Sequence, residues 1–205
     1  MNFSSIELIK SSWQDLKENW KPFYTVASIY GISLLAIQIV AELLAFVHLG
    51  LLGGAISAIF SILLGGGFIF FLLKFIKRES VQIIDLFRLF EDMGLGANYV
   101  VMSILKSALV AIGFLLLFIP GVYLAVGYIF APYLVIDKGF SPWQALEESR
   151  KRVHKNWFQF FIFVLVLAVL NIIGAIPLGL GLIVTIPITY VATTKLYGLV
   201  FGEEV

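Results

Sequence analysis

Residues 158–176 have the sequence FQFFIFVLVLAVLNIIGAI, an uncharged apolar run. A helix needs about 20 predominantly apolar residues to cross the hydrocarbon core of a bilayer, so this run predicts a membrane-spanning helix. Five further stretches of the chain have the same character. Six spans are therefore expected: Phe23–Val47, Leu49–Ile76, Asn98–Phe118, Val122–Ile136, Phe158–Ile176 and Leu178–Gly198.

The composition of the whole chain favours the same class of protein. Of the 205 residues, 60% are hydrophobic and 13% are charged, whereas soluble domains have roughly 45–50% and 25%. A soluble domain of this size cannot bury so much apolar surface, and disorder requires the opposite composition. We expect an all-α, polytopic membrane protein that forms a single membrane domain over residues 1–205.

Several functional classes are disfavoured by the residues that are missing. The net charge of +1 lacks the basic excess typical of a nucleic-acid binder. The absence of Cys excludes disulfides and thiolate metal sites. The two histidines, His48 and His154, are expected on opposite sides of the membrane, and no zinc, phosphate-loop or hydrolase motif is present. We therefore expect no catalytic residues, no cofactor, no metal site and no nucleic-acid partner.

Short turns join the spans into three hairpins, and the charge distribution predicts their orientation. The turns are expected at 48–50, 119–121 and 174–181, where Pro and Gly gather. Lys and Arg accumulate in cytoplasmic loops, and nearly all of them fall on one side of this model. Lys106, the exception inside a span, is expected two turns from the same side, within reach of the interface. Both termini are thus predicted to be cytoplasmic, in the cell membrane.

Each hairpin follows a polar, amphipathic segment, and two of these segments match at a constant offset of 137. Ser4 with Glu7 and Ser141 with Gln144 each form a capping-box pattern that begins a helix. Ser12 recurs as Ser149, and the pair at 19–20 recurs at 156–157. The middle segment keeps only the periodicity. We expect three pseudo-repeat units, 4–76, 79–136 and 141–200, each an amphipathic interfacial helix followed by a hairpin.

The amphipathic segments carry the candidate lipid contacts. All four tryptophans lie in them, and Trp favours the headgroup level of a membrane. The expected interfacial anchors are Trp13, Trp20, Trp143 and Trp157. A second interpretation is that the apolar stripes pack on the protein's own cytoplasmic face. The basic cluster suggests an anionic headgroup site, or only the general cytoplasmic bias of positive charge: Arg150, Lys151, Arg152 and Lys155.

The spans themselves contain few features beyond apolar residues. The ridge Gly50, Gly54 and Ala58 is typical of close helix packing, within the chain or between two copies. Weak points that kink a helix or line a transport path are expected at Gly66, Pro132 and Pro187. The intramembrane polar candidates are Glu42, His48, Lys106 and Asn171. Two interpretations of Glu42 and His48 stay open. They form a pair that handles protons or cations, or they are an acid at the membrane interface and a solvent-exposed histidine in the turn.

Three motifs carry a family resemblance: IPGVYLA at 119–125, APYLVID at 131–137, and SPWQAL at 141–146. With Ser149 and the Asn-Trp pair at 156–157, they resemble prokaryotic integral membrane proteins related to the membrane domain of glycerophosphoryl diester phosphodiesterases. The resemblance covers about residues 119–190 and implies a scaffold type. In the fused members, chemistry belongs to a separate soluble barrel. Only a short tail is expected after the last span here, so no catalytic position is carried over.

Together these patterns predict a non-enzymatic membrane protein that acts as a scaffold or lipid-interacting module. Its expected partners are membrane lipids, in particular anionic ones, and a second copy or a membrane enzyme. Two alternatives stay open at this point. One is a small transporter or channel with a path between the kinked even-numbered helices, and the other is an accessory subunit of a lipid-metabolising enzyme.

Overall fold

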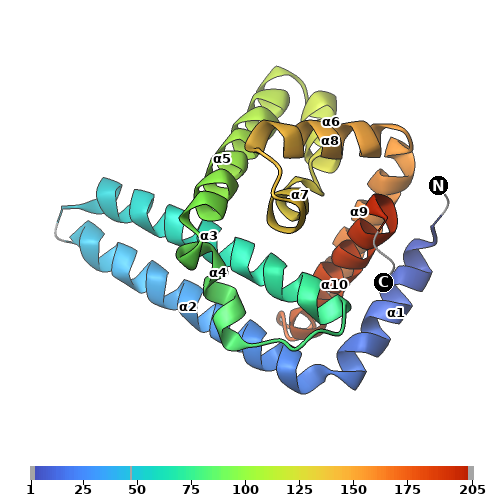
Figure 1. Cartoon of the computed structure of the whole chain (residues 1–205), viewed down its shortest axis with the longest axis horizontal. Coiled ribbons are helices and arrows are strands. Elements are labelled where there is room, and N and C mark those ends of the chain that lie inside the picture. The colour runs from blue at the N-terminus through green and yellow to red at the C-terminus, as the bar shows by residue number, and fades with distance from the viewer. Residues whose placement is uncertain (1–2, 47, 203–205) are drawn as a thin grey trace.

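The computed structural model describes residues 3–46 and 48–202, and in that part every regular element is a helix. Six segments are long and apolar enough to cross a membrane. They confirm the expected all-α, polytopic membrane protein (Figure 1): α2 (Trp20–Phe46), α3 (Gly50–Ile76), α5 (Met93–Leu116), α6 (Phe118–Gly127) with α7 (Ala131–Lys138), α9 (Trp157–Ala175) and α10 (Leu182–Phe201).

The fourth span is the irregular one. It is broken at 128–130 into α6 and α7, and Pro132 lies in the first turn of α7, where a proline without an N–H group is tolerated. The turn before it was expected at 119–121, but the chain reverses at Leu117 and α6 begins at Phe118. Pro120 was therefore misinterpreted as a turn residue, because it too occupies the first turn of a helix.

The other two weak points do not interrupt their helices. α3 continues through Gly66 and Gly67, and α10 continues through Pro187. The two glycines instead permit close packing from outside the helix. A Cβ atom on Gly67 would collide with the backbone carbonyl of Leu86, and one on Gly66 would collide with the side chain of Leu89. The glycine run is thus a docking surface for the segment that follows α3.

Three polar segments precede the hairpins: α1 (Ser5–Glu18), η1 (Ile83–Phe87) with the single turn α4 (Arg88–Glu91), and α8 (Pro142–His154). The middle segment is a 3-10 helix plus one α-turn rather than a full amphipathic helix. Each segment packs on the second helix of the preceding hairpin. η1 packs on α3, α8 packs on α6 and α7, and α1 closes the circle by packing on α10 (Figure 1).

Burial is distributed unevenly among the spans. α7 and α10 supply much of the core, in which Phe130, Leu134 and Tyr197 are completely buried. The outer half of the α2–α3 hairpin projects away from the other helices (Figure 1), and Leu35 and Leu51 there are 65% and 95% exposed. Helices that are apolar on all sides require an apolar surrounding, which a bilayer provides for this hairpin. The expected end of the first span, Val47, lies outside the described residues.

Candidate functional site

The candidate site is the polar face of α8, and its position follows from the local sequence. The backbone N–H of Ser141 donates to Gln144 Oε1 at 3.3 Å, so the capping box predicted from the sequence is formed. Buried residues fix the opposite face against the bundle: Ala145, Leu146, Ser149 and Val153. The basic cluster consequently lies on the outer side of the helix.

Acidic residues one turn earlier on α8 neutralise part of this cluster. Arg150 donates to both carboxylate oxygens of Glu147, at 2.9 and 3.1 Å, and Lys151 lies 3.6 Å from the same carboxylate. These hydrogen bonds raise the pKa of the Arg150 guanidinium and lower the pKa of the Glu147 carboxyl. Glu148 lies 3.9 Å from Arg152.

The rest of the cluster surrounds a shallow polar hollow of about 450 Å³. Arg152 donates to the carbonyl of Val200 at 3.4 Å and covers the ring of Phe201. Lys155 has no ion-pair partner among the residues that the structure describes. The hollow is lined almost entirely by charged side chains: Glu148, Arg150, Lys151, Arg152, His154 and Lys155. The arrangement suits an anion with several oxygen atoms.

Ser149 joins α8 to the break between α6 and α7. Its hydroxyl donates to the carbonyl of Gly127 at 2.7 Å and accepts from the backbone N–H of Phe130 at 3.1 Å. The break leaves these two backbone groups without helical partners, and buried backbone groups require hydrogen bonds. The recurrence of Ser12 as Ser149 marks this position in the sequence, but it does not reveal the contact with residues 127 and 130.

Three acidic residues, whose partners no sequence motif indicated, join α1, η1 and α7 to membrane-spanning helices. Asp15 lies 2.5 Å from Lys195 and 3.9 Å from Arg78. Asp137 accepts from Tyr197 at 2.6 Å and from Lys77 at 3.3 Å, and Asp85 accepts from Lys74 at 2.9 Å. The contacts from α1, α7 and α8 thus converge on α10 between Lys195 and Val200, about 8 Å of helix.

The four tryptophans divide between surface and packing positions. Trp20 and Trp143 are 55% and 60% exposed. Trp13 lies under the ammonium of Lys17 at 4.8 Å, and Trp157 stacks on Phe161 at 5.1 Å while its N–H donates to a carbonyl of α6. Trp20 and Trp143 keep the exposure that an interfacial anchor needs.

No family model, no curated protein and no solved structure matches this chain. The similarity to phosphodiesterase membrane domains therefore stays a prediction that rests on the motifs between residues 119 and 157.

The intramembrane polar residues do not gather into one centre. Glu42 accepts from Gln38 at 2.9 Å, and within the described residues no ion pair joins it to His48. Asn171 donates to Thr189 at 2.8 Å and to a backbone carbonyl of its own helix. Lys106 lies on a different helix, α5, and lines a groove against α6 and α9.

The small residues of α3 divide between the contact with α2 and the exposed surface. A Cβ atom on Gly54 would meet nothing within 4 Å, whereas one on Gly53 would lie 2.8 Å from the Cβ atom of Leu44. Gly53 is therefore the residue that lets α2 and α3 approach. Gly54 and Ala58 face outward, and a Cβ atom on Gly50 would lie 3.5 Å from the Cβ atom of Ala45.

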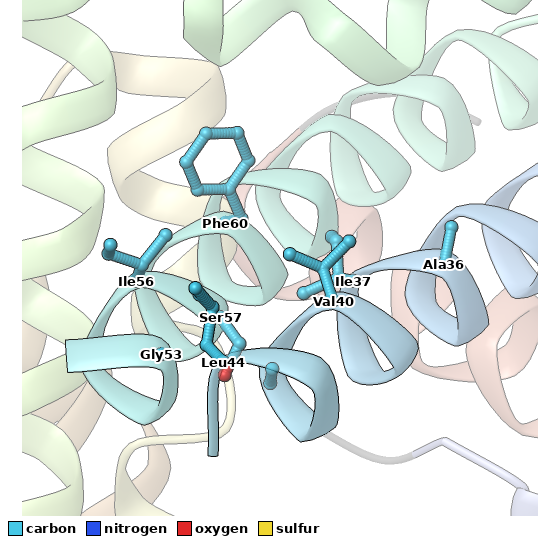
Figure 2. Close-up of a pocket in the computed structure, with 9 residues that line it drawn as sticks. Ala36, Ile37, Val40, Leu44, Gly53, Ile56, Ser57 and Phe60 are labelled. Atoms are coloured by element: carbon cyan, nitrogen blue, oxygen red, sulfur yellow. The ribbon is translucent and has the colours of Figure 1, made fainter. Parts of the chain in front are cut away.

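Beside Gly53, an apolar cleft of about 250 Å³ lies between the two helices. Figure 2 shows that α2 contributes Ala36, Ile37 and Val40 and that α3 contributes Ile56 and Phe60. The hydroxyl of Ser57, the polar side chain in this lining, donates to the carbonyl of Gly54. The cleft offers apolar contacts but no charged group for recognition.

Proposed function

We propose that this chain is a non-enzymatic integral membrane protein that acts as a lipid-interacting scaffold, in which α8 binds anionic headgroups. The observation that carries the proposal is the polar hollow on α8, where Lys155 has no carboxylate partner among the described residues. The phosphate of an anionic lipid supplies the missing negative charge. Near an anionic leaflet each such cation contributes roughly 1 kcal/mol.

The proposal includes the orientation in which all polar segments and both termini face the cytoplasm, in the cell membrane. Two features support it. The ion pair from α1 and the hydrogen bond from α7 reach the same turns of α10 as Arg152 does. The turn that joins α9 to α10 lies at the far end of that helix and exposes Leu178, an uncharged residue, at 96%.

Binding of phospholipids to the full chain in nanodiscs tests the headgroup site. We expect phosphatidylglycerol to be retained in preference to phosphatidylcholine when native mass spectrometry releases the complex. Replacing Lys151, Arg152 and Lys155 together by Gln should lower this preference at least tenfold, because it removes three of the four cations that line the hollow.

The matched control removes three exposed cations from α1 and the first turn of α2, at Lys10, Lys17 and Lys21. A site on α8 predicts that this control keeps most of the preference for phosphatidylglycerol. Equal losses in the two triple variants would show a general attraction of positive charge to the leaflet and would refute the specific site.

Single cysteines test the orientation, because the chain contains no Cys of its own. We expect Leu178→Cys to react with a membrane-impermeant maleimide added to intact cells. Glu79→Cys, in the exposed segment after α3, should react only after the membrane is permeabilised. The opposite pattern, or equal reactivity of the two positions in intact cells, would overturn the proposed orientation.

A further inference from the structure

Lys106 lies too deep in its helix to reach water by extending its side chain. The sequence placed it two turns from the cytoplasmic end of its span, but α5 begins at Met93 rather than near Asn98. With a rise of 1.5 Å per residue, Lys106 is about 20 Å from the first residue of α5 and about 15 Å from the last, Leu116. A lysine stem is much shorter than either distance, so the ammonium stays within the span.

No hydrogen bond or ion pair reaches Lys106 from the residues that the structure describes. Charged groups inside a membrane are costly, and they normally pair with one another or with backbone carbonyls. Among the other polar intramembrane candidates, Glu42 is bound by Gln38 on α2 and Asn171 offers no charge. The described part of the chain therefore leaves this cation to be neutralised by a group from outside.

The ammonium lines one end of a long apolar groove. A hollow of about 370 Å³ combines Lys106 with apolar side chains of α6, of the break after it and of α9, among them Val122, Ala125, Ile129, Phe161, Val164 and Ala168. A second hollow of about 400 Å³ shares three of these residues and continues between α9 and α10. It ends at polar side chains, Asn171, Thr189 and Thr193.

The dimensions suit an extended chain. From Phe161 to Asn171 the groove follows α9 for about 15 Å. Each hollow lies within the range of roughly 300–1,000 Å³ that is usual for small-molecule sites. One cation beside continuous apolar walls is complementary to a molecule with one acidic group and one long apolar chain.

We propose that this groove binds an anionic amphiphile, whose acidic head group pairs with Lys106 and whose apolar chain lies along α9 toward Asn171. The site uses none of the residues that line the hollow on α8, so it is separate from the proposed headgroup site. The amphiphile is a lipid of the bilayer, because the groove is open to the lipid phase and a free anion gains nothing from its apolar walls.

Photolabelling of the full chain in phosphatidylcholine nanodiscs tests this site. The probe is palmitic acid that carries a diazirine on its chain, used at pH 8 and mapped by peptide mass spectrometry. We expect labelling to concentrate on α9 between Phe161 and Ala168 and on the facing part of α6. Unlabelled palmitic acid should compete, whereas hexadecanol and inorganic phosphate should compete at least tenfold less.

Variants of the groove complete the test. Lys106→Leu should reduce labelling of α9 at least tenfold, and Lys106→Arg, which keeps the charge, should retain most of it. Ala168→Phe keeps Lys106 but fills the point where the two hollows meet, so it should also abolish labelling. It provides an independent result if Lys106→Leu fails to fold. The triple α8 variant should label as the wild type does, even if the headgroup site proves wrong.

Three results would overturn the proposal. One is labelling of α9 that is unchanged in Lys106→Leu or Ala168→Phe. Another is equal competition by hexadecanol or by phosphate, which would show that charge and chain are not required together. The third is labelling spread evenly over exposed apolar helices such as the outer half of α2, which would show ordinary contact with bulk lipid.

Discussion

The two amphipathic helices α1 and α8 share a sequence pattern but are fixed to the protein in different ways. Ser12 and Ser149 occupy equivalent positions, and both are completely buried. Ser12 donates to the carbonyl of Leu8 in its own helix, at 2.6 Å. Ser149 instead joins two backbone groups of the broken fourth span. A serine thus bonds only within its own helix in α1, whereas in α8 it stabilises the break between α6 and α7.

The acidic residues of α1 and α8 also differ in whether their partners lie in the same helix. On α1, Asp15 pairs with two residues from other parts of the chain, Lys195 on α10 and Arg78 just after α3. On α8, Glu147 and Glu148 pair with cations of the same helix. α8 therefore docks mainly through a serine and apolar side chains, with one contact from Arg152 to α10, and the rest of its charged face lies outward. This difference explains why α8, rather than α1, is the proposed lipid site.

The largest expected effect comes from removing the two equivalent hydroxyls. Ser149→Ala should lower the free energy of unfolding by about 2 kcal/mol, because it leaves the buried carbonyl of Gly127 and N–H of Phe130 without partners. Ser12→Ala should cost about 0.5 kcal/mol, since the carbonyl that it releases retains its helical hydrogen bond. Reversible unfolding in mixed micelles measures both values. Equal losses of unfolding free energy would show that Ser149 contributes no more to stability than Ser12 does.

The next effect concerns the ion pairs of α1. Asp15→Asn should destabilise the fold by about 1 kcal/mol, because it weakens the partly shielded pair with Lys195 of α10 and a more exposed pair with Arg78. Glu147→Gln on α8 should cost less than Asp15→Asn, because its ion pairs lie within one helix and are exposed to solvent. The same unfolding measurement compares them. If Asp15→Asn proved as mild as Glu147→Gln, the ion pairs would not be what docks α1.

The sequence predicted the elements that depend on local pattern. Apolar length gave the six spans, and the capping residues Ser4 and Ser141 gave the first residues of α1 and α8 to within one position. Apolar runs and helix caps depend on residues that are close together in the sequence. The middle amphipathic segment was predicted less well, because its periodicity fits a 3-10 helix followed by one α-turn as well as a longer α-helix.

The features that were missed depend on contacts between distant residues. Nothing near Asp15 in the chain indicates Lys195 as its partner, and nothing near Ser149 indicates the break at 128–130. The small residues of α3 give a similar example. The four-residue spacing selected Gly54, whereas α2 approaches α3 most closely at Gly53. A spacing of four residues identifies a helix face but not which face meets a neighbour.

A smaller effect distinguishes the two helix N-termini. Ser141 takes part in the complete capping box with Gln144, whereas Ser4 accepts a single hydrogen bond, from the N–H of Glu7 at 3.3 Å. We expect Ser141→Ala to cost about 0.8 kcal/mol and Ser4→Ala about 0.5 kcal/mol. Hydrogen exchange of the amides in the first turn should rise in each variant. A larger loss for Ser4→Ala would contradict the ranking of the caps.

The smallest effect is a pH dependence confined to α8. The hydrogen bond from Arg150 lowers the pKa of the Glu147 carboxyl below its ordinary value of 4.5. Because the folded pKa is the lower one, the stabilisation by this pair is fully present above pH 4.5 and is lost as the pH falls through the folded pKa. Carbon NMR of the Glu147 carboxyl measures this pKa, and Arg150→Gln should return it toward 4.5. The same protonation frees Arg150 and Lys151, so retention of phosphatidylglycerol should increase over that range of pH, and a decrease would contradict the assignment of these cations to the lipid site.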